Sequence, residues 1–144
     1  MWDRSNAEPV IWSKCKVEEF DKIPTLPEDG IWLKPQKWNA GGYDAIFINK
    51  KEKLVRFVQV ANGDSQVFKI EYFSQFLQQL LHHEPSFDIQ TLEIVFLVPE
   101  TKISSFQLTP VTGQGSLSAY PGWEQGDERD SVKILSMERW DGTC

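Results

Sequence analysis

The most constraining feature of the sequence is the order of apolar segments between residues 41 and 99. Two strand-like segments, 41–50 and 53–61, are joined by the polar turn NKKEK, which predicts a β-hairpin. An amphipathic helix is expected over 65–83, with Asp64 or Ser65 as its N-cap. A third apolar strand is expected over 91–99. This order predicts an α/β or α+β fold with a central mixed sheet flanked by helices.

The flanking segments complete a single expected domain over the 144 residues, with its core at 28–99. The segment 14–23 is expected to form one or two helical turns before Pro24 ends them. Residues 100–131 are rich in Ser, Thr, Gly, Pro and acids, which favours a long loop with Trp123 exposed in it. A terminal strand is expected over 132–140.

Composition excludes several classes of protein. The longest apolar run lies around Ile94–Val98, far short of the ~20 residues that a membrane-spanning helix needs. The first ten residues have no apolar stretch behind a basic one, so no secretory signal is expected. Two cysteines are too few for a disulfide framework, which favours an intracellular protein. The net charge of −6 argues against a non-specific coat on nucleic acid.

Two strand residues are polar where the pattern is apolar. Period two puts Asp44 on the face of Ile46 and Ile48, so its carboxylate is expected to point toward the core. On the next strand, Gln59 interrupts an apolar row that includes Phe57. A buried polar group costs a few kcal/mol unless a partner satisfies it, so both positions are candidates for function.

A lysine interrupts the apolar side of the expected helix. At ~100° per residue, Lys69 falls between Phe76 and Leu80, in the middle of the apolar arc. Gln66 lies on the same broad face in the first turn. The simplest explanation is that this end of the helix faces a cleft.

Each of these residues also has a structural explanation. Asp44 could cap a turn, Gln59 could satisfy a loop backbone, and Lys69 could extend along its aromatic neighbours to solvent. Together, however, a carboxylate, an amide oxygen and a lysine match the needs of phosphodiester hydrolysis. That reaction uses oxygen ligands for Mg²⁺ and a cation beside the phosphate.

Three short segments carry a resemblance to a known family. GGYDAIF, FVQV and FKIEYFSQFL, within residues 31–98, resemble the nuclease domain of Crinkler effectors and retrotransposon hot spot proteins. That domain belongs to the PD-(D/E)xK restriction-endonuclease-like superfamily. The resemblance implies a restriction-endonuclease-like domain that cleaves DNA and holds Mg²⁺ or Mn²⁺ through Asp44 and Gln59, with Lys69 as its lysine. Glu18 or Glu19 would be the assisting acid on the first helix.

The sequence departs from the family pattern at two positions. Ala61 stands where the orthodox motif has a lysine, and Gln66 stands where the Crinkler-like pattern has a histidine. These departures leave a second hypothesis open, a catalytically degenerate nuclease fold that binds DNA or a host nuclear protein. The resemblance also implies an effector that acts in the nucleus of a host cell.

Basic residues gather between positions 34 and 56, where six Lys and Arg stand against two acids. Lys50, Lys51 and Lys53 could contact DNA as part of a positive stripe, or could form an ordinary solvated hairpin turn. Gln66, at the position of the missing histidine, is a further candidate for a nucleic-acid contact.

Overall fold

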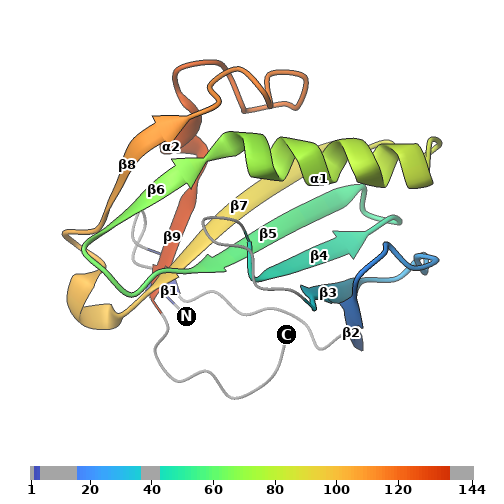
Figure 1. The fold of residues 1–144 in the computed structure, drawn as a ribbon, viewed down its shortest axis with the longest axis horizontal. Coiled ribbons are helices and arrows are strands. Elements are labelled where there is room, and N and C mark those ends of the chain that lie inside the picture. Colours follow the sequence, from blue (N-terminus) through green and yellow to red (C-terminus); the bar gives the residue numbers. More distant parts are fainter. Residues whose placement is uncertain (1, 4–15, 37–42, 137–144) are drawn as a thin grey trace.

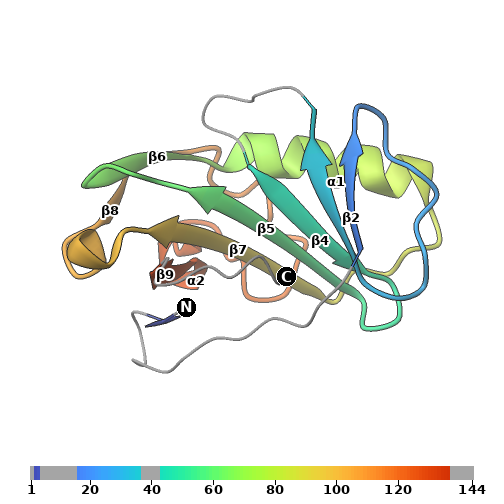
Figure 2. The ribbon, with the colours of Figure 1, turned by 90° about the horizontal axis from the view of Figure 1, so that it is seen from below.

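The computed structural model describes residues 2–3, 16–36 and 43–136 of the chain, which form a small α+β domain. Its principal sheet is mixed and has seven described strands in the order β1-β9-β7-β5-β4-β3-β2 (Figures 1 and 2). A separate ribbon joins β6 to β8. The elements are β1 (Trp2–Asp3), β2 (Lys16–Phe20), β3 (Ile31–Pro35), β4 (Ala45–Asn49), β5 (Leu54–Val60), β6 (Ser65–Lys69), α1 (Ile70–His83), β7 (Thr91–Val98), the 3₁₀ helix η1 (Glu100–Lys102), β8 (Gln107–Thr112), α2 (Glu128–Ser131) and β9 (Lys133–Ser136). The predicted mixed sheet is confirmed.

The sheet is built from an antiparallel meander extended by parallel strands. β3 pairs with β4 and β4 with β5, both antiparallel, and the expected hairpin is therefore confirmed. The chain then crosses through α1 to β7, which pairs parallel to β5, and β9 pairs parallel to β7. The three parallel strands therefore end at one edge of the sheet, where β4 begins.

Helix α1 covers one face of this sheet because its apolar residues recur at helical spacing. The Phe57 ring on β5 lies 5.1 Å from that of Phe73 and 5.6 Å from that of Phe76, measured between centroids. Ile70, Leu77 and Leu80 are also buried on this side of the helix. The described helices are all too short or too polar to cross a lipid bilayer.

The expected start of the long helix is wrong. Residues Ser65–Lys69 form strand β6, and α1 begins only at Ile70. The reason is tertiary, because β6 pairs in parallel with β8, a partner that helical periodicity cannot reveal. Phe68 reaches the core from the strand and stacks edge-on against Phe96 at 5.8 Å. Lys69 is therefore the last residue of a strand and does not lie on the apolar arc of a helix.

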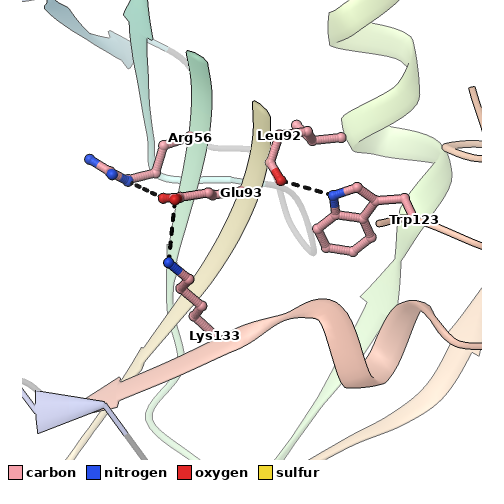
Figure 3. Close-up of polar contacts among 5 residues, drawn as sticks. All are labelled: Arg56, Leu92, Glu93, Trp123 and Lys133. Atoms are coloured by element: carbon pink, nitrogen blue, oxygen red, sulfur yellow. Dashed lines mark hydrogen bonds and ion pairs between the residues drawn. The ribbon is translucent and has the colours of Figure 1, made fainter. Parts of the chain in front are cut away.

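The expected loop over 100–131 is also wrong for much of its length. It contains η1, β8 and all of α2, and the Trp123 side chain is only 2% exposed. The Trp123 indole Nε1 donates a hydrogen bond to the Leu92 carbonyl at 2.9 Å (Figure 3). The buried Glu128 carboxylate accepts hydrogen bonds from the backbone N–H groups of Gly115 and Gly126, both at 2.7 Å. These contacts pack the segment against the domain. The prediction that Trp123 is exposed is therefore wrong.

The N-terminal helical turns are a third correction. Residues Lys16–Phe20 form β2, which pairs in parallel with β3. Their pairing partner lies fifteen positions along the chain, as in the pair of Lys16 with Ile31, so local periodicity could not identify it. The terminal strand is confirmed over Lys133–Ser136. The remaining predicted parts at 14–15, 37–42 and 137–140 lie outside the described residues.

The face of the sheet opposite α1 carries an ion network across three strands. Arg56 and Glu93 are register partners on β5 and β7, and their side chains meet at 2.6 Å (Figure 3). Lys133 on β9 approaches the same carboxylate at 3.3 Å. Burial raises the pKa of Glu93, but the two cations outweigh burial and hold this pKa below its usual value.

This network predicts a pH-dependent contribution to stability. Because the folded state lowers the pKa of Glu93, the unfolded chain takes up the proton first as the pH falls. The stabilisation should be complete above the usual pKa of 4.5 and disappear as the pH falls through the lower folded value. Glu93→Gln should therefore reduce the free energy of unfolding by roughly 1–3 kcal/mol at pH 7, with a smaller deficit at pH 3.

Urea unfolding of the wild type and Glu93→Gln at both pH values measures that difference. Lys133→Met is the control, because half of the Lys133 side chain is exposed and its loss should cost less than about 1 kcal/mol. A deficit for Glu93→Gln that is the same at pH 3 and pH 7 would contradict the ionic origin.

Candidate functional site

The candidate site lies at the sheet edge where β5 ends and β4 begins. The β4–β5 register ends where Ala45 pairs with Val58, and Asp44 then bonds to the residues on either side of Gln59, Val58 and Val60. The fold thus brings together two residues that lie fifteen positions apart in sequence.

Asp44 stands just before β4, at the solvent boundary of the sheet. Its backbone N–H donates to the Val58 carbonyl at 2.8 Å, and its Oδ2 accepts a hydrogen bond from the Val60 N–H at 2.7 Å. Asp44 is exposed, so the expectation that its carboxylate points into the core is wrong. The alternation of β4 breaks there, because the Tyr43 ring packs against Phe57 on the face that Ile46 also occupies. A carboxylate that accepts this hydrogen bond through Oδ2 keeps lone pairs for a further ligand.

Gln59 is the buried member of the pair, with 6% of its surface exposed. Its Oε1 accepts no hydrogen bond from any of the residues that the structure describes. A buried amide oxygen without a partner costs about 1–3 kcal/mol, which makes it an unusual feature of a packed strand. The expected apolar row is confirmed, because Val55, Phe57 and Ala61 are all buried in the core under α1.

The N-terminal end of α1 lies over Gln59. Phe57 contacts Phe73 and Phe76, and Gln59 is two residues further along β5, about 6.6 Å. Since α1 runs back against β5, that distance corresponds to about four helical residues, which brings Gln59 beneath the start of α1. Figures 1 and 2 agree, because in both views α1 begins over the start of β4.

Tyr43 fixes the chain beside Asp44. Its ring lies 6.0 Å from that of Phe73 and 5.4 Å from that of Phe76, measured between centroids. Burial raises the pKa of Tyr43 to about 12, so its hydroxyl stays protonated at neutral pH. Tyr43 therefore anchors the residue before Asp44 under the first half of α1.

Lys69 immediately precedes α1 and lies at the same end of the domain. Its Nζ is 5.2 Å from the centroid of the Tyr72 ring. Its backbone pairs with Thr112 of β8, and the Thr112 hydroxyl donates to the Glu71 carboxylate at 3.0 Å. The expectation that Lys69 lies within the helix is wrong, since it is the last residue of β6.

The candidate assisting acids are not beside Asp44. Glu18 and Glu19 lie on β2, where Glu18 pairs with Leu33, which in turn pairs with Ile46, two residues along the chain from Asp44. β3 separates β2 from β4, a gap of two strand spacings of about 4.8 Å each. The expectation that they lie on a helix is wrong.

The hairpin lysines lie at the opposite end of β4 and β5, about 20 Å along the strand from Asp44. Lys50 Nζ is 2.8 Å from Glu84 and 3.6 Å from Glu28, and the hydrogen bond with Glu84 raises its pKa. Lys53 pairs with Asp88 at 3.6 Å, whereas Lys51 is exposed. The turn is thus partly neutralised and is not continuous with the candidate site.

Sequence reasoning missed one cation at this edge. Lys102, on η1 just after β7, donates from Nζ to the Asn62 carbonyl at 3.1 Å. It also approaches Asp64 at 3.8 Å. The signal that could have found it is the parallel pairing of β5 with β7, which brings the residues after both strands together. Gln66 lies half-buried on β6, opposite Leu108.

The donors at this edge suit a hard divalent cation. Asp44 and Gln59 offer oxygen atoms, which Mg²⁺ prefers. Within the described ranges, no three His, Cys, Asp or Glu side chains gather as a metal-binding group. A cation at this edge would therefore rely on one carboxylate and one amide oxygen from the protein, with water completing its shell.

Gln59 allows a direct test of whether its burial reflects function. Gln59→Leu should raise the free energy of unfolding by about 1–2 kcal/mol, because it removes an unpartnered buried oxygen and keeps a similar volume. Urea unfolding with and without Mg²⁺ measures this change. Mg²⁺ should stabilise the wild type but not the variant.

Gln59→Glu is the matched control, since it restores an anionic oxygen at the same position. It should destabilise the metal-free protein and increase the stabilisation by Mg²⁺. A Gln59→Leu variant that is less stable than the wild type would mean that the amide is structural.

Comparison of the chain with protein families, with curated proteins and with solved structures found no match. The mixed-sheet architecture is therefore established by the structure itself. The function has to be inferred from the residues at the edge that Asp44, Gln59 and Lys69 share.

Proposed function

We propose that this domain is a divalent-cation-dependent nuclease that hydrolyses phosphodiester bonds of DNA, with its site at Asp44 and Gln59. The observation that carries the proposal is the Gln59 Oε1, buried and without a hydrogen-bond partner among the described residues, on the β5 segment whose Val58 and Val60 both bond to Asp44. An oxygen kept in that state at a stability cost is well suited to binding a ligand.

The order of the elements supports the same proposal. Asp44 directly precedes the second strand of the β3–β4–β5 meander, and Gln59 lies on the third. These are the strands on which the PD-(D/E)xK superfamily, to which the sequence shows a resemblance, carries its metal ligands. The helix that follows the third strand begins just after Lys69.

Each residue has a separate role in this proposal. Asp44 and Gln59 would hold Mg²⁺ or Mn²⁺, which when bound supplies Lewis acidity toward the scissile phosphate. The Val60 N–H fixes the Asp44 carboxylate through Oδ2. Lys69 would bring positive charge to the phosphate as negative charge develops on it. Glu18 and Glu19 have no part, because they lie on β2 with β3 between them and β4.

A second candidate function is supported by Ala61. The orthodox motif has its lysine at this position, but Ala61 is 2% exposed and packed in the core, so no cation is available there. Without sufficient charge at the phosphate, the same surface would bind DNA or a host nuclear protein without cleaving it. Metal dependence separates the two functions.

The nuclease proposal predicts that the purified domain nicks supercoiled plasmid in Mg²⁺ or Mn²⁺. Asp44→Asn should reduce the nicking rate more than about 100-fold, because it removes the anionic ligand. The asparagine oxygen can still accept the hydrogen bond from the Val60 N–H, so the fold should persist. A chelator should abolish the activity of the wild type.

The matched control is Asp88→Asn, an exposed acid in an ion pair with Lys53 at the far end of the sheet, which should nick normally. Equal nicking by Asp44→Asn and the wild type would exclude this site. Metal-independent DNA binding without nicking would favour the second function.

Lys69→Met separates a role in cleavage from a role in folding. The Lys69 ammonium lies near the Tyr72 ring, a contact worth up to about 1 kcal/mol at a partly exposed position. We therefore expect lost nicking with a melting temperature within a few degrees of the wild type, measured by plasmid assay and calorimetry. A large fall in melting temperature would make Lys69 structural.

A further inference from the structure

Lys102 is a second cation at the edge where β5 and β7 end. The Ala61 N–H donates to the Leu97 carbonyl at 2.9 Å, which keeps the two strands together to their ends. The chain then turns into η1, and Lys102 reaches back to Asn62, three residues beyond Gln59. No sequence motif singles out this residue.

The present partners of Lys102 are ones that a phosphate could displace. Its Nζ is held by a neutral backbone carbonyl and by Asp64, whose side chain is 81% exposed. Its own side chain is 36% exposed, so solvent and ligands reach the ammonium. An exposed ion pair contributes roughly 0–1 kcal/mol, whereas a charge-assisted contact to a phosphate is stronger.

Four other described cations are held by acids elsewhere in the domain. Arg56 and Lys133 share Glu93 on the opposite face of the sheet. Lys50 and Lys53 pair with acids at the far end of the hairpin. Lys69 directly precedes α1, and Lys102 is held at Asn62, just beyond the end of β5.

We propose that Lys102 binds a backbone phosphate of the DNA substrate, next to the phosphate at Asp44 and Gln59. This inference rests on the proposed function and adds a substrate contact to it. Lys102 would act in binding and not in the chemical step, so its removal should affect KM and leave kcat nearly unchanged.

The salt dependence of DNA binding tests this contact without requiring cleavage. The affinity of the intact domain for a short DNA duplex would be measured in Ca²⁺ across a series of KCl concentrations. Loss of one phosphate contact reduces the slope of log K against log [salt] by about 0.9. Lys102→Met should show that reduction, and Lys102→Arg should restore the wild-type slope.

Two further variants distinguish the loss of the Lys102 charge from the loss of its hydrogen bond and from a loss of positive charge elsewhere. Lys102→Gln can still donate a hydrogen bond to the Asn62 carbonyl but has no charge, so it should reduce the slope as Lys102→Met does. Lys16→Met removes the same charge from β2, where the side chain is 72% exposed, and should leave the slope unchanged.

The outcomes distinguish this inference from the proposed function. A wild-type slope in Lys102→Met and Lys102→Gln would overturn the Lys102 contact, whatever the nicking assay shows. A reduced slope together with normal nicking by Asp44→Asn would overturn the nuclease site and retain Lys102 as a DNA contact. No DNA binding by the wild type at low salt would overturn the inference.

Discussion

The packing of α1 onto Phe57 is the contact on which the rest of the domain depends. It joins the meander to the crossover, so that β7 can pair in parallel with β5. The same contact sets the position of α1 along the sheet. Because Phe57 lies under Phe73 and Phe76, the residues two steps further along β5 come beneath the beginning of the helix. The core thereby determines where Gln59 and Lys69 lie relative to each other.

Sequence patterns predicted the elements whose partners lie nearby. The β4–β5 hairpin, most of α1 and β7 each have a period that a single segment displays. The sequence could not predict β2, β6 or β8, because each pairs in parallel with a distant segment and carries mixed polarity. The failure to predict the β6–β8 pair explains two errors. Once β8 is overlooked, Ser65–Lys69 reads as the first turn of a helix and Gln107–Thr112 reads as loop.

The candidate site also contains some residues that local sequence patterns reveal and others whose positions depend on distant strand pairing. Asp44 and Gln59 could be identified because each is polar in an apolar pattern, and the hydrogen bonds of Asp44 to Val58 and Val60 then bring it beside Gln59. Lys102 could not be identified, because its position depends on the parallel ends of β5 and β7. Trp123 and Glu128 illustrate the related error of treating a Gly-rich segment as exposed. Their buried hydrogen bonds hold that segment against the domain.

The charge distribution is more informative than the net charge of −6. At the hairpin end, acids from the end of α1 and the following loop pair with Lys50 and Lys53. These pairs leave little positive electrostatic potential to attract a phosphate. At the opposite end, Lys69 lies near an aromatic ring, and Lys102 is held by a carbonyl and an exposed acid. A polyanion approaching an acidic domain gains most where cations are least neutralised. The same end holds the unpartnered Gln59 oxygen, so charge and burial favour one surface independently.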